Sequence, residues 1–186
     1  NTPPYPGYGS GDSSASTDYS KIGIMNFRHN NSNTKEEIYF NAERIDDLEN
    51  DAPDFSAVNN TRYFIGRSHF WGGSFNGRIA EIVTYSSTNS DSNDTDFRNR
   101  IQSYLGIKYG ITLAPDANGT TKDYVNSDGT IIWDHVANNG YNHDIAGIGR
   151  DDVSELNQKQ SQSINNASDG TGRTEGILTI GLDEIY

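Results

Sequence analysis

Cysteine is absent from this chain of 186 residues, and histidine and hydrophobic residues are scarce. No disulfide can staple the fold, so the redox compartment cannot be read from thiols. The four histidines stand apart, with no His-x-x-x-His pair and no cysteine to join them, which argues against a transition-metal site. Hydrophobic residues make up only 32% of the chain, so we expect a thin, β-rich core.

Long apolar runs and basic residues are also scarce. No run approaches the ~20 apolar residues that a membrane-spanning helix requires, and no signal-peptide pattern opens the sequence. A mature segment of a longer protein is therefore expected. With 14 Lys and Arg against 26 Asp and Glu, the formal net charge of -12 argues against nucleic acid or an anionic membrane as partner. Such an acidic surface suits solubility outside a cell.

Residues 75–113 carry the most information. Residues 77–85 alternate as in a largely buried strand, and carboxylates then crowd the start of a segment in which apolar residues recur at helical spacing. This pattern predicts an amphipathic helix over residues 94–109, closed by Gly110. We expect one side of the helix to be buried and the other to face water. The buried side is Phe97, Ile101, Tyr104 and Leu105, and the wet side is Arg98, Asn99 and Gln102.

The strand from Phe75 to Ile82 with Tyr85, followed by Tyr104 to Leu113, resembles a known family. It is similar to the end of the laminin-G-like, concanavalin A-like lectin/glucanase sandwich found in large secreted proteins of Bacteroidota. The resemblance implies a mainly β fold: an incomplete antiparallel sandwich with one helix over residues 1–113, then a small β-rich module over residues 114–186. The opening strands of the sandwich have no counterpart here, so other segments of the same large protein are expected to supply them.

Further strands are predicted on both sides of this region. Before it, we expect strands at 22–27 and 62–66, with a hairpin around Asn41 and Ala42. Ala resists the positive φ of a type I′ turn, so a longer loop or a different turn is expected there. After it, short β-like runs at 130–133, 145–148 and 177–182 resemble a module that follows the sandwich in the same surface proteins and has no activity known to us.

The carboxylates of this chain favour structural roles over catalysis. Glucanases of the resembled class use Glu-x-Asp-x-x-Glu on one strand, whereas Glu43 and Asp46 have the wrong spacing and would point to opposite faces. Glu81, inside an apolar strand, favours a structural ion pair with Arg78 or Arg62 over a catalytic acid. Hydrolase, Walker and dinucleotide motifs are missing from the sequence.

Two kinds of ligand site remain. Calcium accepts carboxylate, amide and carbonyl oxygens in loops, although such turns are also common without metal. The aromatic loop before the 77–85 strand either stacks on a sugar or packs over the sandwich edge. The candidate calcium ligands are Asp116, Asn118, Asp123, Asn126, Asp128 and Asp134, and the candidate sugar-binding residues are His69, Phe70 and Trp71.

Two functions follow as hypotheses. The first, implied by the resemblance, is a non-catalytic module of a bacterial cell-surface adhesin exported by the type IX secretion route. It would bind glycan or matrix or a surface protein, or space other modules. The alternative is a segment of a glucanase-type hydrolase whose catalytic strand lies outside this chain. The lack of a paired-carboxylate strand favours the first.

Overall fold

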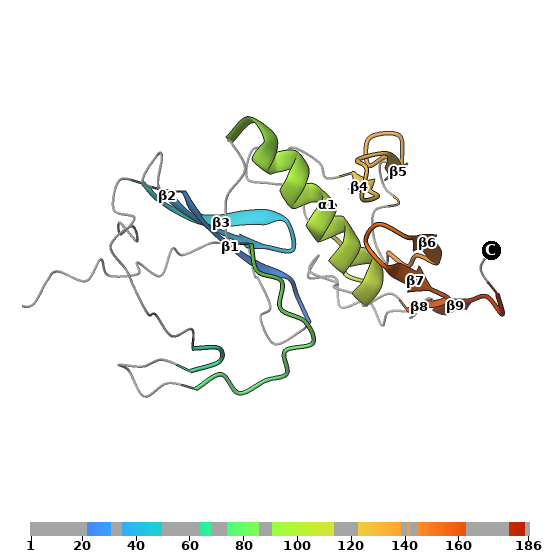
Figure 1. Ribbon diagram of the computed structural model, residues 1–186, viewed down its shortest axis with the longest axis horizontal. Helices are drawn as coiled ribbons and strands as arrows, with labels where there is room; N and C mark the ends of the chain where they lie inside the picture. The colour runs from blue at the N-terminus through green and yellow to red at the C-terminus, as the bar shows by residue number, and fades with distance from the viewer. Residues whose placement is uncertain are drawn as a thin grey trace, which may run out of the picture.

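The structure is a computed structural model in which the described residues are 22–30, 35–49, 64–67, 74–85, 91–113, 123–138, 141, 145–162 and 179–184. This part of the chain is mainly β, with small antiparallel sheets and a single helix, as predicted (Figure 1). The sandwich arrangement itself stays a prediction. The elements are β1 (Met25–Asn30), β2 (Lys35–Phe40), β3 (Glu43–Glu49), α1 (Asp91–Tyr109), β4 (Tyr124–Val125), β5 (Ile131–Trp133), β6 (Gly149–Asp151), β7 (Leu156–Gln158), β8 (Gln160–Gln162) and β9 (Thr179–Gly181).

The predicted hairpin is present, but its turn differs from the prediction. β1, β2 and β3 form an antiparallel sheet in that order, and β2 turns into β3 through Asn41 and Ala42 alone, at φ 48° and 76°. Both expected alternatives, a longer loop and a different turn, are therefore wrong, because positive φ at both central residues is what a type I′ turn requires. Tertiary contacts hold the unfavourable alanine: Ala42 is 2% exposed, and Asn41 Oδ1 accepts the N–H of Ile24 at 2.8 Å. Burial and this hydrogen bond offset the cost of a left-handed alanine.

Residues 75–85 do not form the predicted strand. Within the described residues this segment pairs with no strand, and large apolar side chains such as Ile79 and Ile82 are 48% and 51% exposed. A strand needs a partner for its backbone N–H and C=O groups, and none of the described segments supplies one. Residues 64–66 likewise form no strand, although Arg67 and Ser74 form an isolated bridge.

The helix is confirmed. α1 begins at Asp91, three residues before the predicted start, and ends at Tyr109 before Gly110, whose φ of 66° fits the predicted left-handed cap. It lies between the three-stranded sheet and the C-terminal hairpins (Figure 1).

Three sides of α1 contact three different segments. Ser103 Oγ accepts an N–H from β4 at 3.0 Å. Lys108 bonds to Glu81, and the Arg98 guanidinium lies 4.0 Å from the centre of the Tyr39 ring on β2. A helix enclosed in this way has little surface left for water.

The expected wet side of α1 is therefore wrong. Gln102 is 1% exposed, and Arg98 and Asn99 are half-buried. The four residues expected to be fully buried are half-buried instead. The spacing of apolar residues predicted that only one side of the helix would be buried, whereas the fold covers the helix from several directions.

The C-terminal hairpins are small. β4 pairs with β5, β6 with β7, and β8 with β9. The predicted strands at 130–133 and 177–182 are confirmed as β5 and β9, whereas residues 145–148 are not a strand and β6 begins only at Gly149. Gln158 Nε2 joins β7 to the helix by donating to the Ile107 carbonyl at 2.8 Å. It also donates to the Gly147 carbonyl, just before β6, at 3.0 Å.

One apolar cluster joins both predicted parts of the chain. Its buried members come from the residue before β1, the β2–β3 turn, the segment after α1, and β4: Ile24, Ala42, Ile111, Leu113 and Tyr124. The Tyr124 hydroxyl donates to the Ile111 carbonyl at 3.3 Å and accepts the Leu113 N–H at 2.8 Å. The core therefore crosses the predicted boundary between residues 113 and 114, and the division into two domains stays a prediction.

Among the described residues, no helix is both long enough and apolar enough to cross a membrane.

Candidate functional site

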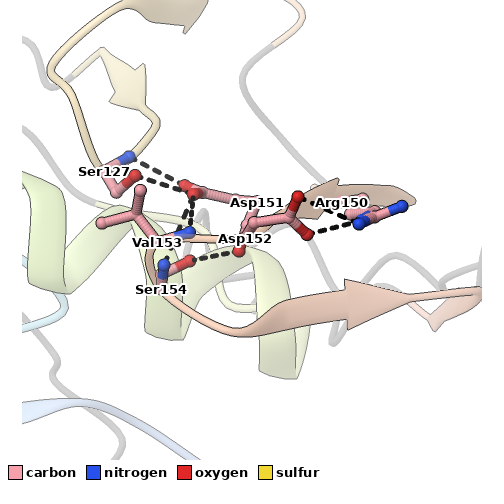
Figure 2. Close-up of polar contacts among 6 residues, drawn as sticks. All are labelled: Ser127, Arg150, Asp151, Asp152, Val153 and Ser154. Atoms are coloured by element: carbon pink, nitrogen blue, oxygen red, sulfur yellow. Dashed lines mark hydrogen bonds and ion pairs between the residues drawn. The ribbon is translucent and has the colours of Figure 1, made fainter.

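A group of polar contacts in the C-terminal half centres on Asp151, at the end of β6 (Figure 2). Its carboxylate accepts the Ser127 N–H at 2.8 Å and the Ser127 hydroxyl at 2.7 Å. It also accepts the N–H groups of Val153 and Ser154 at 3.2 and 3.4 Å. One side chain thus organises the turn after β6 and anchors the turn between β4 and β5.

The helix holds the same β4–β5 turn from another direction. Arg100 donates to the Ser127 carbonyl at 3.1 Å and is paired with Asp96 one turn earlier in α1 at 2.6 Å. Gly129 lies against this guanidinium at φ 91°, and a Cβ there would be 2.9 Å from Arg100 Nη2. The positive φ favours glycine at this position, whereas the close approach is to the flexible end of the Arg100 side chain, which can move aside.

The electrostatics fit a bracing role. Burial opposes ionisation of Asp151, but the hydrogen bonds from Ser127 and Ser154 outweigh it and lower its pKa. Hydrogen bonds from Thr130 lower the pKa of the exposed Asp128 in the same way, although the charge of Asp151 opposes this shift. Both carboxylates are therefore ionised at neutral pH.

The structure separates the predicted calcium ligands. Asn126 and Asp128 share one turn, where each Oδ1 accepts the Thr130 N–H at 2.8 Å. Asp134 Oδ1 instead accepts the Ala137 N–H, and Asp123 Oδ1 accepts the His135 N–H, each at 2.8 Å. Asn126, Asp128 and Asp134 therefore stabilise local turns, whereas Asp123 joins the residue before β4 to the segment after β5.

The remaining predicted ligands lie outside the described residues. These are Asp116 and Asn118 in the calcium set and the whole aromatic patch, His69, Phe70 and Trp71. Within the described ranges, no group of three or more His, Cys, Asp or Glu side chains is arranged to hold a metal ion. Calcium stays a prediction.

Sequence reasoning missed Asp151. The spacing of Asp151 and Ser154 is typical of a turn in which a carboxylate accepts the following N–H groups. That local signal does not reveal the contact with Ser127, which is 24 residues away in the sequence.

A second polar cluster surrounds Glu81, where the structure confirms the predicted ion pair but not its predicted partner. Glu81 Oε2 accepts hydrogen bonds from Lys108 Nζ and the Tyr109 hydroxyl, both at 2.8 Å, and Oε1 accepts from the Tyr104 hydroxyl at 3.3 Å. The predicted partner Arg78 is wrong because helix α1, not a neighbouring strand position, faces this carboxylate, and the other predicted partner, Arg62, lies outside the described residues. The cluster fastens residues 75–85 to the helix.

The pKa shifts in this cluster suit structure better than proton transfer. The hydrogen bond from Lys108 lowers the pKa of Glu81 and, in return, raises the pKa of Lys108 well above its usual range. Burial, with the hydrogen bond to Glu81, raises the pKa of Tyr109. A general acid at neutral pH needs the opposite shift in its carboxyl group.

Asp151→Asn is expected to destabilise the protein by about 1 kcal/mol, because an amide oxygen cannot replace both carboxylate oxygens as acceptors. Since the pKa of Asp151 is lowered on folding, its contribution is present at neutral pH and is lost as the pH falls through the folded-state pKa. Urea unfolding at neutral and acidic pH measures this. Asp152→Asn, with a side chain 73% exposed, is the matched control. An equal effect of the two substitutions would contradict the bracing role.

Comparison with known proteins gives one match. Residues 97–184 match the model of a family described as a domain of unknown function (DUF8202), which is just under half of the chain. No curated protein and no solved structure matches the chain. The matched region begins on α1 and ends after β9, so it unites the helix with the C-terminal hairpins that pack against it.

Proposed function

We propose that this chain is a non-catalytic module of a secreted bacterial cell-surface protein of adhesin type, exported by the type IX route. The module would bind glycan, matrix or a surface protein, or hold neighbouring modules apart. The acidic, cysteine-free composition and the resemblance of residues 75–113 to the lectin-like sandwich support this proposal.

The observation that carries the proposal is that carboxylates of this chain accept hydrogen bonds from other segments of the same chain. Asp151 accepts four hydrogen bonds from turns of the same chain, and both oxygens of Glu81 accept donors from α1. Carboxylates engaged in this way join segments to one another and lower the free energy of the folded chain. A spacer or binding module benefits from such bracing, whereas catalysis requires a carboxylate that is free to meet a substrate.

We also propose where a ligand would bind. Calcium would be recruited by the turn that contains Asn126 and Asp128, whose remaining oxygen atoms are of the kind that this ion accepts. A glycan would stack on the aromatic residues His69, Phe70 and Trp71.

Thermal unfolding with Ca²⁺ and with a chelator tests the metal. Calcium at 100 times its Kd adds about 2.7 kcal/mol of stability, which corresponds to a shift in Tm of roughly 5 to 10 °C. Asp128→Asn should reduce the shift, and Asp152→Asn, which removes a carboxylate paired with Arg150, should not.

Glycan-array binding tests the sugar. Trp71→Ala should abolish binding, while Tyr141→Ala, which removes an aromatic ring that is 77% exposed in the C-terminal half, should leave it intact. If neither Ca²⁺ nor any glycan binds, only the spacer role stands. Hydrolysis of β-glucans that is lost in a folded Glu81→Gln variant would overturn the non-catalytic proposal.

A further inference from the structure

The stretch from Phe75 to Glu81 is held at its two ends and at no point between them by residues that the structure describes. The Phe75 N–H donates to the Gly66 carbonyl at 2.7 Å, and the Glu81 carboxylate accepts three hydrogen bonds from α1. Residues 76–80 make no hydrogen bond with any residue of the described ranges. The backbone dihedral angles of these residues are therefore not fixed by hydrogen bonds of the fold.

Asn76 and Gly77 begin this unrestrained stretch, and both are exposed. Asparagine is among the chemically labile residues of proteins. Its carboxamide carbon is electrophilic, and attack by the backbone nitrogen of the next residue closes a five-membered ring. Glycine in that next position has no Cβ to obstruct the attack, and its backbone adopts φ of either sign. The chain therefore presents both reacting groups side by side, in contact with water.

A second pair of this kind in the described part of the chain, Asp128 and Gly129, is restrained. The Gly129 N–H donates to the Asn126 carbonyl at 3.1 Å, so the nitrogen is engaged. The Asp128 carboxylate accepts the Thr130 N–H at 2.8 Å, so the side chain is held as well. Reaction at Asp128 therefore requires the turn to open first. The Asn–Gly pairs at 118–119 and 139–140 lie outside the described residues.

We propose that Asn76 is a site of spontaneous deamidation in the folded chain. The Gly77 backbone nitrogen, after losing its proton, forms a bond to the Asn76 carboxamide carbon. The bond from that carbon to the NH₂ group then breaks, and the group takes up a proton and leaves as ammonia. Water opens the resulting cyclic imide at either carbonyl, which gives aspartate or isoaspartate. Water is the only co-reactant.

The product differs from the parent chain in charge and in backbone length. Each event adds one negative charge to a formal net charge of -12. The isoaspartate product also adds a methylene to the main chain between Phe75 and Glu81, the two residues that anchor the stretch. Because ammonia is lost to solution, the modified fraction rises with the age of the protein.

Mass spectrometry of the purified protein tests this proposal. The protein is incubated near neutral pH, folded in one sample and in guanidinium chloride in another, and circular dichroism checks the folded state. Trypsin cleaves after Arg67 and Arg78, and Asn76 carries the only side-chain amide of the peptide 68–78. We expect its conversion to proceed at about the same rate in both samples, because the fold does not restrain it.

Isoaspartate formation at Asp128, read by electron-transfer fragmentation, is the internal control. It should be about 100-fold slower in the folded sample than in guanidinium chloride, because the turn must open first. The deamidation rate at Asn76 should rise with pH, since the Gly77 nitrogen attacks only after losing its proton.

Substitutions test the two reacting groups separately. Asn76→Gln should abolish the conversion, because the longer side chain must close a less favourable six-membered ring. Gly77→Ala should slow it about tenfold, since the added Cβ obstructs the attack. That Cβ would meet the far end of the flexible Phe75 side chain, which can move aside. Gly149→Ala, where a Cβ would meet no atom within 4 Å, is the matched control and should leave the rate unchanged.

Three results would overturn the inference. Conversion at Asn76 that is more than about tenfold slower in the folded sample would show that the fold restrains this stretch. An unchanged rate in Gly77→Ala would show that the Gly77 nitrogen is not the attacking group. Equal rates at Asp128 in the two samples would show that hydrogen bonds of the fold do not decide which pair reacts.

Discussion

Glu81→Gln is expected to lower the melting temperature by about 5 °C, which corresponds to on the order of 2 kcal/mol for a chain of this length. Glu81 joins residues 75–85 to α1 through three donors: Lys108, Tyr104 and Tyr109. Glutamine keeps one acceptor oxygen but places an NH₂ group where a carboxylate oxygen meets donors. Because the Glu81 and Lys108 side chains are 24% and 35% exposed, water compensates for part of the loss.

Thermal unfolding followed by circular dichroism at neutral pH measures this effect. Glu43→Gln, a half-buried position at the start of β3, is the matched control and should change the melting temperature little. The pKa of Glu81 is lowered in the folded state, chiefly by Lys108, so the contribution of Glu81 is lost as the pH falls through its folded-state pKa. The difference between the native chain and Glu81→Gln should therefore shrink in acid. Equal melting temperatures at neutral pH would show that the segment is not fastened by this cluster.

The features that the sequence predicted well are those set by neighbouring residues. α1 follows from apolar spacing within its own turns, and Gly110 ends it through the freedom of its own backbone. Asn126 and Asp128 share a turn because Asx side chains bond to N–H groups a few residues ahead.

The features that it missed depend on distant segments. The partner of Glu81 is Lys108, 27 residues later, and the partner of Asp151 is Ser127, 24 residues earlier. Residues 75–85 have the alternation of a strand, but alternation reports only which side chains could share a face and not whether a neighbouring strand is present. Gln102 was assigned to water because a polar residue normally lies there, and the fold covers it instead.

Ile111→Ala is expected to have the largest effect, a destabilisation of about 2 to 5 kcal/mol. Ile111 is 1% exposed and lies immediately after the helix cap, where its N–H bonds to the Gly106 carbonyl at 2.8 Å. It belongs to the same cluster as Ile24 near the first sheet and Tyr124 on β4. Truncation leaves a cavity in a group of buried apolar side chains that joins these segments. Ile132→Ala on β5, at a position 55% exposed, is the matched control and should cost far less.

The regions that lose stability in Ile111→Ala would show whether the chain folds as one domain or as two. Hydrogen exchange measured by mass spectrometry reports separately on peptides from β1–β2 and from β4–β5. Because the cluster takes side chains from both regions, we expect Ile111→Ala to reduce protection in both by the same factor. Lost protection in only one region would show that the cluster does not couple them. The predicted boundary between residues 113 and 114 would then divide two independent domains.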